Sequence, residues 1–159
     1  MAQKFIEYLL EAQKITKSAD HLFYITFPLI KDKRLLMKIL TESKKAIICC
    51  INSILQYEYL QKSIKLEKDS VANFKIFREK CAEKYSVNSE EIALIIEIFN
   101  LMEKHKKSTH EILKDNKIII LSGEMNQDSV SLEKTKSFLN LTKSLLAKTK
   151  NGFKNLRKI

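Results

Sequence analysis

The chain has 159 residues, and the 45% that are hydrophobic are enough to fill one core. Two glycines and one proline are too few for the turns of a β-sandwich or barrel, which favours a mainly helical protein. The formal net charge of +10 comes from 26 lysines and only three arginines, so the charge alone says little about a partner.

The first predicted helix covers residues 3–26, where apolar side chains recur every three or four positions. Pro28 is expected to end it, because proline disfavours helical continuation. A long second helix should follow over residues 32–62, with Asp32 as its N-cap. Its middle, residues 46–60, is apolar on nearly every face, which is typical of a helix at the centre of a bundle.

A third helix is predicted to end near residue 85, with Asp69 or Ser70 as its cap. Ser89 is expected to cap a fourth helix, in which residues 92–102 are also apolar nearly all round. These two patterns add one amphipathic and one buried helix to the predicted bundle.

Residues 117–131 break the helical pattern. A β-branched run from Lys117 is followed by turn residues at Gly123 and Asn126, so we expect a short β-hairpin. Ser131 should then cap a last helix over residues 132–150.

The expected fold is therefore mainly α, a bundle of four to five helices with one short β-hairpin before the last helix. Residues 1–159 are expected to form a single domain, with a hairpin near 117–131 and a basic tail at 152–159. The N-terminal segment lacks a secretory pattern and no apolar run reaches roughly 18 residues, so we expect a cytoplasmic protein without a membrane span.

The three cysteines do not indicate a disulfide framework. Cys49, Cys50 and Cys81 lack metal-ligand spacing, and the first two lie in an apolar run that disfavours a thiolate. We interpret them as buried, inert thiols. The alternative is a redox pair or a nucleophile.

Histidine occurs only at positions 21, 105 and 110. His105 and His110 are five residues apart, about 140° around a continuous helix, and neither has a carboxylate four residues later. We therefore expect no metal site and no cofactor. The nucleophile elbow, glycine-rich phosphate loop and zinc-protease motif are also missing, which favours a protein that is not an enzyme.

The positive charge is concentrated late in the chain. Residues 1–103 hold 16 basic and 14 acidic side chains, a net +2, whereas residues 104–159 hold 13 and 5, a net +8. Such asymmetry indicates nucleic acid, an anionic membrane surface or another acidic partner. A solvated lysine face that keeps the protein soluble is the simpler alternative.

Two segments carry the candidate binding residues. One is the polar stretch 104–117, and the other is the lysine face of the last helix. The nucleic-acid-binding candidates are Lys104, His105, Lys106, Lys107, Ser108, Lys114, Lys117, Lys136, Lys143 and Lys150. Asp20 beside His21 is a weaker candidate, more simply explained by local hydrogen bonds at a helix end.

The segments DHLFYITFPLIKDKRLLMKIL and HKKSTHEILKDNKIII resemble a family of uncharacterised archaeal helical proteins. The family's second motif runs HKKSP, then a hydrophobic residue and Glu. In this chain residues 105–108 and Glu111 match, whereas Thr109 replaces the proline and His110 follows it. No established activity comes with this resemblance, which spans most of the chain.

The helical layout more distantly resembles HEPN domains, which often form dimers and include ribonucleases with an Arg, four to six intervening residues and a His. His105 would take the His position, but the Arg position falls on Ile98, Phe99 or Asn100. The resemblance therefore implies a non-catalytic relative.

Our leading hypothesis is a non-enzymatic, dimeric helical bundle that binds RNA or another polyanion through its basic C-terminal third. The alternative is a metal-independent HEPN-type endoribonuclease with catalytic His105, assisted by His110 or Lys104. A third hypothesis is a helical protein-protein adaptor that uses exposed apolar residues of the first helix.

Overall fold

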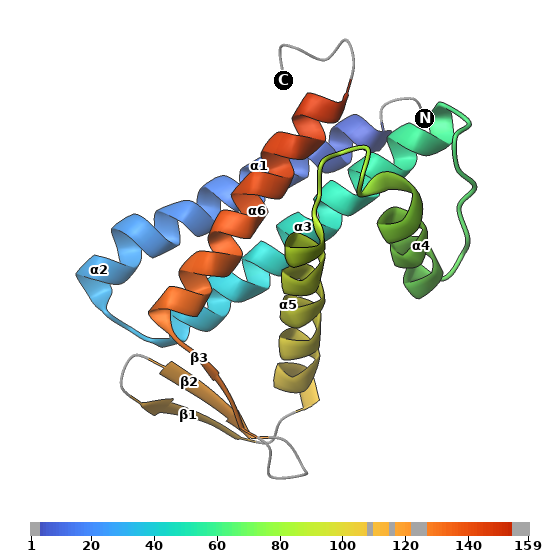
Figure 1. Ribbon diagram of the computed structural model, residues 1–159. Coiled ribbons are helices and arrows are strands. Elements are labelled where there is room, and N and C mark those ends of the chain that lie inside the picture. The colour runs from blue at the N-terminus through green and yellow to red at the C-terminus, as the bar shows by residue number, and fades with distance from the viewer. Residues whose placement is uncertain (1–3, 108–109, 115–116, 122–126, 154–159) are drawn as a thin grey trace.

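The computed structural model describes residues 4–107, 110–114, 117–121 and 127–153, and the side chains of residues 4–105 and 131–153 (Figure 1). The described chain is mainly helical, as predicted. None of its helices is long and apolar enough to cross a membrane.

Three long helices form the centre of the fold: α1 (Lys4–His21), α3 (Arg34–Leu60) and α6 (Leu132–Gly152). They lie against one another along most of their lengths (Figure 1). Leu9, Ile47, Ile54 and Phe138 are fully buried between them. The apolar middle of α3 thus lies in the core, as its sequence pattern predicts.

Pro28 does not end the first helical segment, and this prediction was wrong. The chain passes from α1 through a π-helical turn, η1 (Leu22–Thr26), into the short helix α2 (Phe27–Ile30). In an α-helix, proline lacks the N–H that would donate to the carbonyl four residues earlier, and its ring collides with that carbonyl. Here Pro28 lies at the start of α2, directly after the wider π turn, so neither the missing hydrogen bond nor the collision stops the helix. The helix ends where Lys31 takes a left-handed conformation with φ 58°.

The third predicted helix is interrupted. Asp69 caps α4 (Ser70–Ile76) by accepting hydrogen bonds from the N–H groups of Val71 and Ala72, which confirms the predicted cap. A second π-helical turn, η2 (Phe77–Cys81), follows directly, and the chain then leaves the helix in a series of turns. Phe77 and Cys81 are buried against the core.

The fourth predicted helix is α5 (Ser89–Lys107), and its cap differs from the prediction by one residue. Asn88 accepts from the Glu91 N–H at 2.8 Å, and Glu91 accepts from the Asn88 N–H at 3.2 Å. This reciprocal capping box satisfies two N–H groups of the first turn, which Ser89 does not reach. Only one side of α5 is fully buried, and the helix runs steeply away from the three long ones (Figure 1).

Before α6 the described residues form a three-stranded antiparallel sheet in the order β1-β2-β3, where the sequence predicted one short hairpin over residues 117–131. The strands are β1 (His110–Lys114), β2 (Lys117–Leu121) and β3 (Gln127–Val130). The β-branched run forms the central strand, as its composition favours. Ser131 caps α6 by accepting from the Lys134 N–H, as predicted.

The C-terminal end of α6 packs tightly on the chain that precedes α5. A Cβ atom at Gly152 would lie 2.2 Å from the ring of Tyr85, so only glycine fits there. The next residue, Phe153, packs edge-on against Phe5 and tilted against Tyr57. This aromatic cluster joins both ends of the described chain to α3.

Candidate nucleic-acid interface

The segment 104–117 does not form one compact site. Lys104 is exposed and His105 is half-buried near the end of α5, whereas His110 begins β1. The strand register pairs His110 with Leu121 and Lys114 with Lys117, at opposite ends of the same ladder. Four residue steps separate the two ends, roughly 13 Å of extended chain.

Several predicted binding residues lie outside the described side chains. They are Lys106, Lys107, Ser108, His110, Lys114 and Lys117. Lys106 and Lys107 end α5, His110 and Lys114 begin and end β1, and Lys117 begins β2. Ser108 lies outside the described residues.

Much of the lysine face predicted for α6 is occupied by carboxylates of neighbouring helices. Lys143 forms an ion pair with Asp20 of α1, and its Nζ lies 5.0 Å from the centre of the Tyr24 ring. Because the Coulomb attraction and the ring already hold this ammonium, Lys143 is a poor candidate for a ligand contact. Asp20, a weaker candidate from the sequence, is thereby explained as its partner.

Two more lysines of α6 hold α5 in place. Lys134 pairs with Glu97, and Lys148 donates to Glu91 and, at 2.8 Å, to the Ser86 carbonyl oxygen. Burial alone would raise the pKa of Glu91, but the hydrogen bonds from Lys148, the Asn88 N–H and Ser144 outweigh it and hold that pKa below its usual value. These lysines are structural.

Lys136 and Lys150 are the candidates on α6 that form no ion pair with a described residue. Lys136 is exposed in the first turns of α6, whereas Lys150 is half-buried in its last turn. They lie near opposite ends of a helix of 21 residues, which is about 30 Å long. They therefore cannot belong to one small site.

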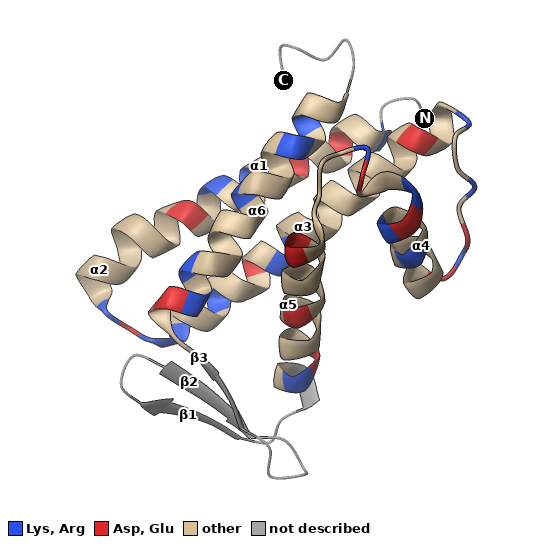
Figure 2. Cartoon of the chain, in the orientation of Figure 1, with Lys and Arg blue, Asp and Glu red and all other residues tan. Residues whose placement is uncertain are grey.

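Lys136 lies at the end of the molecule that carries the sheet, and we call this end the basic end. Here α5 carries the exposed Lys104 in its last turn, α6 starts after β3, and α3 carries the exposed Lys38 in its first turns. Ile39 and Leu139 share a small core cluster, which brings the starts of α3 and α6 together. Figure 2 shows Lys and Arg positions on all three elements there. The basic end is defined by Lys38, Lys104 and Lys136.

A buried carboxylate that sequence reasoning missed lies at the other end of α3. Glu58 is 2% exposed and accepts hydrogen bonds from Lys84 at 2.7 Å, Tyr85 at 2.8 Å and Ser63 at 2.8 Å. Burial would raise its pKa, but these donors outweigh that effect and keep the pKa below its usual value. Ser63 follows the end of α3, whereas Lys84 and Tyr85 belong to the turns after η2, so the cluster works as a structural clamp between these segments.

The cysteines behave as the sequence predicts. Cys50 and Cys81 are buried, Cys49 is half-buried, and all three are free thiols. Burial raises the pKa of Cys50 to about 12 and that of Cys81 to about 11, so neither forms a thiolate near neutral pH. Among the described residues, no cluster of His, Cys, Asp and Glu side chains has a geometry suited to a metal ion.

An open hollow of about 660 Å³ lies beside the C-terminal end of α3, far along that helix from the basic end. Tyr59 and Leu60 form its wall together with the loop residues Lys62, Ile64 and Lys65. None of the binding candidates from the sequence lines it.

No protein-family model matches the chain, and no curated protein or solved structure matches it either. The resemblances to the archaeal family and to HEPN domains stay predictions that rest on the residues quoted for them.

Proposed function

We propose that this protein binds RNA or a similar polyanion at its basic end, without catalysis. The observation that supports this proposal most directly is the distribution of lysines over three chain segments. Lys38 and Lys136 are exposed and pair with no described carboxylate, and Lys104 is exposed near the C-terminal end of α5. Lysines contributed by separate elements suit the closely spaced phosphates of a nucleic acid.

The chemistry of the basic residues favours contacts with phosphates over contacts with bases. Lysine accounts for 26 of the 29 basic side chains, because arginine occurs only at positions 34, 78 and 157. An ammonium group is a point charge, whereas the arginine fork is the usual bidentate partner of guanine. Binding is therefore expected to be strongly salt-dependent and to depend little on nucleotide sequence.

The pairing of α6 lysines narrows the proposed surface. Lys134, Lys143 and Lys148 already have carboxylate partners on α1 and α5, and releasing them for a ligand would weaken the packing of those helices. Lys136 is therefore the α6 residue that we assign to ligand binding. Lys143 is excluded from the proposed surface by its ion pair, and Lys150 by its place at the other end of α6.

The test uses gel shifts of end-labelled single-stranded RNA and duplex DNA at several salt concentrations. For the wild-type protein the logarithm of the binding constant should fall linearly with the logarithm of the salt concentration. Replacing Lys38, Lys104 and Lys136 together with Gln should reduce the steepness of that line by about 2 to 3.

A matched control replaces Lys62, Lys65 and Lys68 with Gln, because these exposed lysines lie in the loop at the other end of α3. The control variant has the same net charge as the test variant and should bind almost like the wild type. Equal losses in the two variants would mean that charge alone, and not the basic end, attracts RNA, and this would refute the proposed surface.

The same samples on a denaturing gel separate binding from cleavage. Intact RNA supports the binding proposal, whereas cleavage that disappears in His105→Ala would replace it with the HEPN-type ribonuclease. No observation on the described residues favours that alternative, since His105 and His110 belong to different elements.

A further inference from the structure

Four large apolar side chains are exposed within seven residues at the corner between α1 and α3. Leu29 is 80% exposed, Ile30 62%, Ile25 51% and Tyr24 44%. Single exposed apolar residues are normal on a soluble protein, but a contiguous group usually marks an interaction surface. We call this group the apolar corner.

The local sequence explains why these side chains are exposed. Residues 22–30 are apolar except for Thr26 and the hydroxyl of Tyr24, so a helix with one inward face cannot bury them all. Phe23 and Phe27 take the inward positions and are buried. Their neighbours therefore point away from the core.

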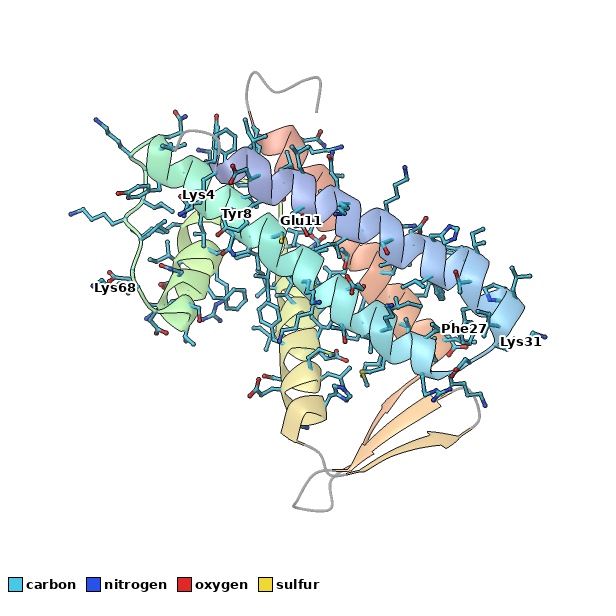
Figure 3. The ribbon with its side chains drawn as sticks, turned by 180° about the vertical axis from the view of Figure 1, so that it is seen from behind. Lys4, Tyr8, Glu11, Phe27, Lys31 and Lys68 are labelled. Atoms are coloured by element: carbon cyan, nitrogen blue, oxygen red, sulfur yellow. The ribbon has the colours of Figure 1, made fainter. Side chains whose placement is uncertain are left out.

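The charges around the apolar corner leave a positive excess. Asp20 pairs with Lys143, and Asp32 pairs with Arg34 at 2.8 Å. Lys31 and Lys33 remain, and neither pairs with a described carboxylate. Lys31 directly follows Ile30, and its side chain projects outward from the corner (Figure 3).

The shape of the apolar corner is convex. The short helix α2 lies at an outermost end of the molecule (Figure 1), and the four side chains in and beside it are exposed. A convex apolar tip beside lysines is complementary to a bilayer surface, where acyl chains lie below a layer of phosphates.

We infer that the apolar corner docks on an anionic lipid bilayer, with Leu29 and Ile30 inserted below the headgroups and Lys31 and Lys33 against lipid phosphates. Tyr24 suits the same position, because its ring is amphipathic and prefers the membrane interface. The contact is peripheral and reversible, since few side chains insert and no described helix could span the membrane. This inference is independent of the proposed RNA surface, which uses Lys38, Lys104 and Lys136.

The experiment is sedimentation of the full chain with vesicles of phosphatidylcholine alone and with 30% phosphatidylserine. The wild-type protein should bind the anionic vesicles and bind the neutral ones far less. Replacing Leu29 and Ile30 together with Ser should weaken binding to anionic vesicles by about tenfold or more, because two aliphatic side chains no longer insert. Lys31→Glu should weaken it at least roughly fivefold, since a basic residue near an anionic surface contributes about that factor.

Matched controls come from similarly exposed positions elsewhere. Val71 is 74% exposed on α4, and Lys68 lies near the opposite end of the molecule from Lys31 (Figure 3). Val71→Ser and Lys68→Glu should bind the vesicles much like the wild type. All of these side chains are exposed, so circular dichroism is expected to give the same folded spectrum for every variant.

The chain contains no tryptophan, which allows an optical readout of insertion. In a Leu29→Trp variant the emission should shift to shorter wavelength when anionic vesicles are added, because the indole leaves water. The emission of Val71→Trp should not shift.

Three results would overturn the inference: no binding to anionic vesicles, equal binding by the Leu29/Ile30 serine variant, or an unshifted emission of Leu29→Trp. A wild-type dimer that the serine variant loses, without vesicle binding, would assign the apolar corner to self-association. RNA gel shifts of the same variant should be unchanged, so a failure of either proposal is recognisable by itself.

Discussion

Glu58 illustrates how a single residue connects distant parts of this chain. It lies in an apolar stretch of α3, and two of its partners, Lys84 and Tyr85, are 26 and 27 residues away in sequence. Sequence periodicity identifies the helix but not the function of Glu58 as a hydrogen-bond acceptor. The relevant signal was a lone charged residue on an otherwise apolar face, which requires a partner when it is buried.

Replacing Glu58 with Gln should lower the free energy of unfolding at neutral pH by about 1–3 kcal/mol, because three donors lose a charged acceptor. The folded-state pKa of Glu58 lies below the unfolded value. As the pH falls, the unfolded chain therefore takes up the proton first, and the contribution of Glu58 to stability is lost below about pH 5.

Urea unfolding at pH 7 and pH 3 measures this effect. The difference between wild type and Glu58→Gln should shrink toward the acidic pH, whereas the exposed Glu79→Gln control should differ little from wild type at either pH. A difference that stays constant with pH would show that Glu58 contributes by packing alone.

At the scale of elements, the sequence predicted helices more reliably than their ends. The two largest errors concern Pro28 and the cap of α5. Pro28 was read as a stop because the preceding turn was assumed to be α-helical, and the π-helical turn η1 removes that assumption. The cap was placed one residue late, because Asn88 and Ser89 are both good caps and only the position of Glu91 distinguishes them.

Asn88→Ala should lower the free energy of unfolding by about 1 kcal/mol, because the first turn of α5 loses its side-chain acceptor. Ser89→Ala should change it by less than about 0.5 kcal/mol, since Ser89 is exposed and does not form the cap. Denaturant titration of both variants is the test. A larger loss of unfolding free energy in Ser89→Ala than in Asn88→Ala would contradict the assigned cap.

The sheet shows a different limit of sequence reasoning. The run from Lys117 to Leu121 was recognisable as a strand from its β-branched residues, and it is the central strand. His110–Lys114 was read as part of a polar rim, because strands with charged residues at their ends lack that signal. An edge strand is defined by the neighbour it pairs with, which one sequence does not reveal.

For the whole molecule, the number of charged residues can be counted in the sequence, but which of them form ion pairs cannot be read from it. The lysine face of α6 looked like a ligand surface because its carboxylate partners, Asp20, Glu91 and Glu97, lie on α1 and α5. Only the folded arrangement of the helices brings them together. For this reason the proposed binding surface lies at one end of the molecule and not along the whole of α6.

The arrangement of helices predicts that local stability is uneven. α1, α3 and α6 pack along their lengths, whereas α5 contacts them over a smaller area and depends on the pairs Lys134–Glu97 and Lys148–Glu91. Amide hydrogen exchange followed by mass spectrometry should therefore be faster in α5 than in the middle of α3. Equal protection of both would show that α5 opens only when the whole protein unfolds.

The close fit of Gly152 under the ring of Tyr85 links two positions that are far apart in the sequence. A side chain at position 152 displaces the ring, and with it the phenol that donates to Glu58. Substitutions at 152, 85 and 58 are therefore not independent of one another. During divergence from a common ancestor these three positions should change together or stay as they are.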